Sequence, residues 1–417
     1  MKITGIIAEY NPFHNGHHYQ FEQIRSHAEE TGLIVVMSGN YVQRGEPSFY
    51  DKYTRTRAAL IAGADLVLEL PTAFATSSAE DFAAASVALL DRLGCVDELC
   101  FGSECGQIPP LTEIAALLVR EPEAYRIGLR EGIRQGLTFP QARNRALSLW
   151  ISDHTSDPDI DWDILLGSPN NILGIEYLKA LIRRNSPIKP VTITRLGQGY
   201  HGQDLTHGFA SASGIRSFVS AAGSPDLPDA VKVQVPPTVL PLYEKAVPIF
   251  ADDCSLLLNQ TLLQLSHKQQ PLDEFADVSP ELGARIANQL LDFTSYTERI
   301  NQLKTRQYTY TRISRSLLHI LLGIKTCEIA GYRDLDYTPY ARVLGFRKNS
   351  ASLLARIKAH SDIPLITKVA GAGRALPPPA AGMFAQDLYG AHLYQMIQQQ
   401  KSGVLPRNEY TRSVIIL

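Results

Sequence analysis

Residues 3–20 read ITGIIAEYNPFHNGHHYQ. The stretch begins as an apolar run typical of a buried strand and continues as a polar segment with helical spacing, so a helix should begin near His14. The unpaired N–H groups in the first turn of a helix attract phosphate, and side chains three residues apart share one face there. Gly16 lets the chain and a ligand approach closely because it has no Cβ. The stretch therefore predicts that His14 and His17 bind phosphate groups.

Two other interpretations of these histidines stay open. One histidine could cap the helix beside a solvated neighbour, or His18 could join the other two in holding a metal ion. The segment has no Asp, Glu or Cys at a complementary spacing, and so no metal site is predicted.

Short apolar runs alternate with helical patterns over the first hundred residues, as in parallel βαβ units. We expect an α/β fold with a Rossmann-like, doubly wound parallel sheet, in which ligands bind beyond the carboxyl ends of the strands. A helical insertion is expected at about residues 107–165, a helix at 171–184 and a last strand at 191–196. The expected early strands cover residues 3–9, 33–38, 65–70 and 98–102.

Five prolines between residues 223 and 241 interrupt regular structure, which predicts a domain boundary. Residues 1–222 would form the nucleotide-binding domain, and residues 242–417 a smaller, mostly α-helical domain. Between Arg299 and Arg374 the chain has fourteen basic and four acidic residues. Cations mixed with stacking surfaces suit RNA, although a solvated basic face over core aromatics would have the same composition. The aromatic residues in this stretch are Tyr308, Tyr310, Tyr332, Tyr337, Tyr340 and Phe346.

The composition is that of an ordinary folded protein. The 417 residues are 45% hydrophobic and 20% charged, with a net charge of -2, so several domains are expected and any RNA-binding surface must be local. Five cysteines without a C-x-x-C pair indicate neither a disulfide framework nor structural zinc. Apolar runs stay below the roughly 18 residues of a membrane span, and the first residues lack signal-peptide features. We expect a cytoplasmic protein without a membrane partner.

A second motif, at residues 211–216, reads SASGIR. Ser211 and Ser213 offer hydroxyl donors and Arg216 a fork for phosphate oxygens, although a serine helix cap is the simpler explanation. With His14-Asn15-Gly16-His17 after the first strand, this motif resembles the signature of the HIGH-type nucleotidyltransferase superfamily. The resemblance implies that His14 and His17 are catalytic residues of adenylyl transfer. It also implies that Ser211, Ser213 and Arg216 bind phosphate.

Longer motifs narrow the resemblance to one family. They read GIIAEYNPFHNGHHY at 5–19, SGNYVQRGEP at 38–47, FGSE at 101–104, SPNNILG at 168–174 and YARVLGF at 340–346. Together they span nearly the whole chain and resemble the bacterial tRNA(Met) cytidine acetate ligases. The resemblance implies activation of acetate by ATP, with Mg²⁺, as acetyl-adenylate, followed by acetylation of N4 of the wobble cytidine of elongator tRNA(Met). No prosthetic group is implied, and the basic carboxyl portion would assist tRNA docking.

By position, the resemblance also implies an ATP site. Gly102 would let the nucleotide lie against the backbone, or it could simply be an ordinary turn glycine. Asn170 could contact ribose or adenine or cap the next helix, and the choice between Asn170 and Asn171 stays open. Arg195 could pair with phosphate or with a nearby acid. The implied ATP-binding residues are Ile7, Ala8, Glu9, Tyr10, Asn11, Pro12, Phe13, His14, Asn15, Gly16, His17, His18, Tyr19, Gln20, Gly102, Asn170 and Arg195.

Lys52 and Arg44 are expected on loops at the carboxyl edge of the sheet. There they could neutralise acetate or pyrophosphate, or simply be solvated charges. Two other functions stay open: an adenylyltransferase acting on a small phosphorylated metabolite, and a non-catalytic tRNA-binding protein with ATP as a regulatory ligand. The basic carboxyl half argues against the first, and the paired histidines argue against the second.

Overall fold

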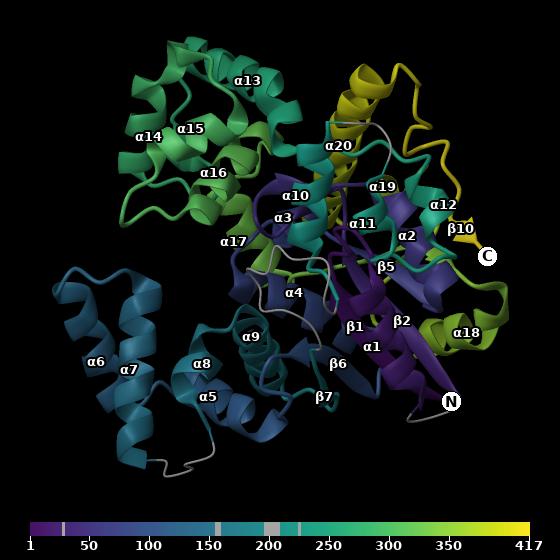
Figure 1. Ribbon diagram of the computed structural model, residues 1–417, viewed down its shortest axis with the longest axis horizontal. Coiled ribbons are helices and arrows are strands. Elements are labelled where there is room, and N and C mark those ends of the chain that lie inside the picture. Colours follow the sequence, from purple (N-terminus) through teal and green to yellow (C-terminus); the bar gives the residue numbers. More distant parts are fainter. Residues whose placement is uncertain (27–29, 155–159, 196–208, 224–226) are drawn as a thin grey trace. The chain divides into compact units, whose positions relative to one another are not determined.

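The computed structural model describes residues 1–26, 30–154, 160–195, 209–223 and 227–417, and is shown in Figure 1. The chain folds into two compact units. One unit consists of Met1–Val96 and Leu196–Leu417, and the other of Asp97–Arg195. Among the described residues, no helix combines the length and apolar character needed to cross a membrane.

A mostly parallel sheet forms the centre of the first unit. β1, β2 and β5 are parallel to one another, whereas β8 is antiparallel to β5. β2 and β5 are buried throughout, as expected for central strands rich in Val, Ile and Leu. The strand order is β10 (Ile415–Ile416), β8 (Ala341–Phe346), β5 (Leu66–Leu70), β2 (Thr31–Ser38) and β1 (Lys2–Ala8), and β9 (Leu365–Ile366) pairs with β8.

Helices follow the parallel strands as the alternating pattern predicts. α2 (Lys52–Ala62) begins where the Asp51 carboxylate accepts hydrogen bonds from two backbone N–H groups, and it ends at Gly63, whose φ of 125° suits glycine. The other helices of this unit are α1 (Asn15–Ser26), α3 (Thr72–Ala75), α4 (Ala79–Arg92), α10 (Ala212–Ala222), α11 (Asp229–Lys232), α12 (Leu240–Tyr243), α13 (Ser255–His267), α14 (Pro280–Asn288), α15 (Tyr296–Leu303), α16 (Tyr310–Leu322), α17 (Thr326–Asp334), α18 (Ala351–His360), α19 (Ala372–Ala375) and α20 (Pro378–Ser402).

The compact units do not follow the predicted boundary between residues 222 and 242. β8, from the portion predicted to be a helical domain, adds to the sheet beside β5. The long helix α20 also joins this unit, because Tyr41 donates a hydrogen bond to the Gly390 carbonyl and Tyr394 to that of Ser48. The division predicted at the prolines is therefore wrong for the sheet, to which both halves of the chain contribute.

The second unit contains a parallel pair of strands, β6 (Glu98–Ser103) and β7 (Lys189–Thr194), as predicted. Gly174 packs against the β6 side chain of Phe101, whose Cε2 would lie 2.6 Å from a Cβ at that position. Helices occupy the segment in which the insertion was expected. They are α5 (Ile108–Arg120), α6 (Glu123–Arg134), α7 (Phe139–His154) and α8 (Trp162–Gly167), and α9 (Pro169–Arg184) follows.

Candidate nucleotide-binding site

Two imidazoles lie against each other at the junction between β1 and α1. The ring centroids of His14 and His17 are 3.9 Å apart, with an interplanar angle of 35°. The Gly16 N–H donates to Nδ1 of His14 at 3.0 Å, and the His14 N–H donates to Nδ1 of His17 at 3.3 Å. A ring nitrogen that accepts a hydrogen bond carries no proton, so each neutral ring carries its proton on Nε2. The backbone therefore gives both histidines an Nε2–H donor at the start of a helix.

His14 also caps α1, as one of the alternative interpretations proposed. Its carbonyl accepts from the N–H groups of His17 and His18, and its Nδ1 accepts from Gly16. A Cβ on Gly16 would lie 2.9 Å from Cε1 of His14, so the ring can occupy this position only beside glycine. Because the cap uses Nδ1, it is compatible with phosphate binding through Nε2.

Two buried aromatic rings, those of Tyr10 and Phe13, pack against the His17 ring. The Tyr10 ring meets it edge-on at 4.8 Å, and the Phe13 ring lies at 5.5 Å. Tyr10 and Phe13 are buried. Tyr10 also has a φ of 46°, in the left-handed region that bulky residues rarely adopt. This packing restricts the orientation of the His17 ring.

The late motif lies beside the first one. Arg216, on α10, donates from Nη1 to the Asn11 carbonyl at 2.7 Å. Ser211 caps α10, accepting from the Gly214 N–H at 3.1 Å, and its hydroxyl lies 3.0 Å from that of Ser213. The simpler explanation for Ser211 is thus correct, and the motif still brings its arginine to the histidine loop.

Arg44 belongs to the same neighbourhood. It lies in the turn between β3 (Tyr41–Val42) and β4 (Glu46–Pro47). Burial raises the pKa of Glu46, whereas the positive charges of Arg216 and Arg44 act to lower it. Arg44 thus lies on a turn, as the loop prediction expected, and its charge acts on the same carboxyl group as that of Arg216.

Gln234 ties the two motifs together, although it is not among the predicted site residues. Its carbonyl accepts from the Asn15 N–H, and its side-chain oxygen accepts from the Ala210 N–H, both at 2.9 Å. The neighbouring Val233 carbonyl accepts from the Asn15 side chain at 2.9 Å. Gln234 lies in the proline-rich stretch, where no periodic pattern marks a buried residue.

The second unit places its candidate residues around Glu104. The side-chain amide of Asn170 donates to the Glu104 carboxylate at 2.6 Å. Asn171 is fully buried, and its side chain binds the N–H groups of Glu104 and Cys105 and the Leu165 carbonyl. Asn171 thus serves the fold with both side-chain atoms, which favours Asn170 as the residue that meets a nucleotide.

Gly102, on β6, lies next to Arg195, which directly follows β7. The Arg195 N–H donates to the Ser103 carbonyl at 3.0 Å. A Cβ on Gly102 would lie 3.1 Å from Cγ of Arg195, so the absence of a side chain makes room for the arginine. The structure therefore groups the candidate residues into two sets, the histidine loop with the late motif in one unit, and Gly102, Asn170 and Arg195 in the other.

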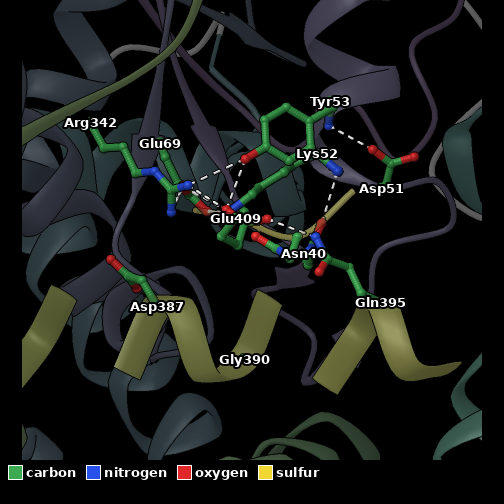
Figure 2. Close-up of polar contacts among 12 residues, drawn as sticks. Asn40, Asp51, Lys52, Tyr53, Glu69, Arg342, Asp387, Gly390, Gln395 and Glu409 are labelled. Carbon is green, nitrogen blue, oxygen red and sulfur yellow. Dashed lines mark hydrogen bonds and ion pairs between the residues drawn. The ribbon is translucent and has the colours of Figure 1, made fainter. Parts of the chain in front are cut away.

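Lys52 does not lie on a loop, contrary to the prediction. It is the first residue of α2 and is completely buried, and its Nζ lies 2.8 Å from Glu69 and 3.1 Å from Glu409. Arg342 binds the same two carboxylates, as Figure 2 shows. Two cations and two anions thus balance inside the protein, because an unpaired buried charge would be costly. Lys52 is a structural residue.

Asp387 adds a pH dependence to this cluster. Burial raises the pKa of Asp387 to about 6, and the charge of Glu69 adds to the rise. The ordinary pKa of an aspartate is near 3.8, so between about pH 3.8 and pH 6 the Asp387 carboxyl is protonated in the folded protein and ionised in the unfolded chain. The free energy of unfolding should therefore fall as the pH rises through that window.

Asp387→Asn should remove roughly 2–3 kcal/mol of this pH dependence. Urea unfolding of both proteins from pH 4 to 7 measures it, and parallel curves would contradict the assignment.

Arg55 is a buried residue that holds the carboxyl ends of β1 and β2, and it is not among the predicted site residues. It is fully buried. A charged residue in a helix gives no sequence signal of burial. The guanidinium donates to the carbonyls of Glu9, Ser38, Gly39 and Tyr50 and to the hydroxyl of Ser48.

Several charges of the basic carboxyl stretch are used within the fold. Arg342 joins the buried cluster, Arg315 pairs with Asp277 at 2.8 Å, and Arg333 pairs with Asp81 at 2.7 Å. The aromatic residues do not form the expected exposed stacking surfaces. They are packed into the protein and buried or half-buried: Tyr308, Tyr310, Tyr332, Tyr337, Tyr340 and Phe346. The alternative of core aromatics under a basic face describes this stretch better.

In the part of the chain that the structure describes, no three His, Cys, Asp or Glu side chains form a group able to hold a metal ion.

Comparison with known proteins gives matches that span nearly the whole chain. A family model described as HIGH Nucleotidyl Transferase matches residues 1–407. A "tRNA(Met) cytidine acetate ligase" of Acetivibrio thermocellus is 37% identical over 100% of both chains. One of Clostridium kluyveri is 39% identical over 100% of this chain and 99% of its own.

Solved structures give the same match. Thermotoga maritima TmcAL in its apo form I superposes with a TM-score of 0.90, and form II, bound with alpha-thio ATP, with 0.89. Each is 28% identical in sequence and covers 100% of both chains.

Proposed function

Because the chain belongs to the tRNA(Met) cytidine acetate ligase family of HIGH nucleotidyltransferases, we propose that it activates acetate with ATP and acetylates elongator tRNA(Met). The acceptor is N4 of the wobble cytidine, and the product is N4-acetylcytidine. The pair of imidazoles at the start of α1 carries the proposal, since it offers two donors where a nucleotide's phosphates bind. A similar protein that binds an ATP analogue supports the choice of nucleotide.

The proposed reaction has two steps. A carboxylate oxygen of acetate attacks the α-phosphorus of ATP, the bond to the β-phosphate oxygen breaks, and pyrophosphate leaves. The cytidine amine then attacks the acetyl carbonyl, loses a proton, and displaces AMP. Adenylation itself activates the acid, so no enzyme nucleophile is needed.

The histidine loop acts on the first step. Nε2–H groups of His14 and His17 donate to oxygens of the α- and β-phosphates, where negative charge develops in the transition state. The donors are set in place by the backbone hydrogen bonds to Nδ1, so they need no reorganisation during the reaction. Ser213 and Arg216 extend the site toward pyrophosphate.

The segment from Ile7 to Gln20 surrounds the nucleotide in this proposal. Gly102, Asn170 and Arg195 supply the contacts to ribose, adenine or phosphate. Mg²⁺ enters with ATP, since this ion keeps several waters and binds through substrate phosphates rather than through a protein cage. A tRNA substrate places the work of the enzyme in the cytoplasm.

The proposal is tested by incubating the protein with ATP, Mg²⁺, ¹⁴C-acetate and a tRNA(Met) transcript. Label should appear in N4-acetylcytidine after nuclease digestion, and only when ATP is present. A transcript with uridine in place of the wobble cytidine is the matched control and should stay unlabelled.

Acetate-dependent exchange of pyrophosphate into ATP tests the first step without tRNA. Absence of exchange would contradict acetate activation and would leave ATP as a regulatory ligand. Pyrophosphate release that depends on a phosphorylated metabolite and ignores tRNA would identify a metabolic adenylyltransferase instead.

A further inference from the structure

A helical hairpin in the second unit carries a concentration of arginine. It consists of α6 and α7, which pack side by side, as Figure 1 shows. From residue 123 to residue 154 the sequence contains five arginines and no lysine. Arginine suits phosphate better than lysine does, because its planar fork can donate two parallel hydrogen bonds.

Small residues bring the two helices close together. A Cβ on Gly128 would lie 3.4 Å from the Cβ of Ala146, and one on Gly132 would lie 2.8 Å from that of Ala142. Arg143, on α7, forms an ion pair of 2.9 Å with the buried Glu176 of α9. The hairpin is thus closely packed on its inner face and tied to the rest of its unit.

The outer face of α6 carries Arg126, Arg130 and Arg134. All three are exposed, and their spacing of four residues places them in one row along the helix. Among the described residues, none of the three forms an ion pair or a hydrogen bond through its side chain. Like charges at this spacing destabilise a helix by about 0.2–0.5 kcal/mol per pair. A row of cations without ion pairs is therefore unfavourable for the free protein and suited to an anionic partner.

The tip of the hairpin continues this surface. Arg145, exposed on α7, donates to the side chain of Gln135 just after α6. Phe139, at the start of α7, is 58% exposed. An exposed aromatic ring on an arginine-rich hairpin is typical of surfaces that stack on unpaired bases.

We infer that the row of Arg126, Arg130 and Arg134 binds the phosphate backbone of the tRNA, with Phe139 available for stacking on an unpaired base. The inference rests on the proposed function for its partner, and it locates tRNA binding on the helical hairpin instead of the basic carboxyl half. α6 also exposes Glu123 and Glu131, but among the described residues neither forms an ion pair with the row, and the three arginines exceed these two acids by one charge. Arginine-rich helices that carry aromatic side chains bind RNA through charge and stacking together.

The test replaces all three arginines by glutamine, which keeps helix propensity and removes charge. Filter binding of tRNA(Met) transcript at several salt concentrations should show at least about tenfold weaker binding near 0.1 M salt, and a salt slope lower by about two. Phe139→Ala should weaken binding by severalfold without changing the slope. Acetate-dependent pyrophosphate exchange, which needs no tRNA, should be unchanged in both variants and shows that they are folded.

The matched control replaces exposed cations of the carboxyl half: Lys358→Gln, Lys368→Gln and Arg374→Gln. It should bind tRNA as the unaltered protein does. Unchanged affinity of the α6 variant, with acetylation by the unaltered protein intact, would overturn the inference and leave the row for a protein or lipid partner. Absence of acetate-dependent exchange in the unaltered protein would instead contradict the proposed function.

Discussion

Replacing His17 by alanine is expected to lower acetate-dependent pyrophosphate exchange by about 10²–10³-fold, because it removes a preorganised donor to developing negative charge. The loss should be in the rate of adenylate formation. His17 lies above the buried rings of Tyr10 and Phe13 without contributing to the sheet, so the thermal midpoint should change little. Exchange kinetics and a melting curve on the same preparation measure both quantities.

His14 needs a different substitution because it also caps α1. His14→Asn keeps a side chain that favours the cap position and removes the Nε2–H donor. It should lose activity nearly as fully as His17→Ala while keeping its stability, whereas His14→Ala should lose about 1 kcal/mol of stability as well. If His14→Asn retained full activity, the capping role alone would explain this histidine.

Arg55→Ala is expected to have the largest effect on stability. The change leaves the carbonyls at the ends of β1 and β2 without their buried donor and opens a cavity, which together should cost about 3–5 kcal/mol of the free energy of unfolding. Urea unfolding followed by circular dichroism measures the loss. If the alanine variant does not accumulate, Arg55→Lys, which keeps the charge and loses the fork, should fold with a smaller deficit.

The matched control is Arg57→Ala, two residues further along the same helix. Arg57 is exposed, so its loss should change the free energy of unfolding by no more than about 0.5 kcal/mol. Equal effects of the two substitutions would show that the buried contacts of Arg55 contribute little.

Periodic patterns predicted the early strands well. The expected strands at residues 3–9, 33–38, 65–70 and 98–102 coincide with β1, β2, β5 and β6 to within a few residues, because buried parallel strands are short apolar runs separated by helical patterns. The predicted α/β nucleotidyltransferase fold is confirmed by the family model and the solved structures. β8 was missed because its strand lies among helical patterns, far along the chain from β5, beside which it pairs.

The arrangement of the candidate site was predictable where local spacing controls it. His14, Gly16 and His17 lie within one turn, so their spacing alone indicated that they would contact one another. The prediction that Lys52 lies on a loop was wrong because its carboxylate partner Glu409 lies more than 350 residues away, and no local pattern encodes such a pair. The side-chain amide of Asn170 contacts the Glu104 carboxylate, whereas that of Asn171 contacts backbone groups, and this difference appears only once the chain is folded.

The buried cluster of Lys52, Glu69, Arg342 and Glu409 imposes an order on biosynthesis. Glu409 is synthesised more than 350 residues after Lys52, and the charges of Lys52 and Glu69 must stay hydrated until it is made. The ribosome must therefore extend the polypeptide by that length before the cluster can close. A chain truncated before Glu409 would keep a buried cation without one of its carboxylates, and it becomes a natural target for quality-control proteases.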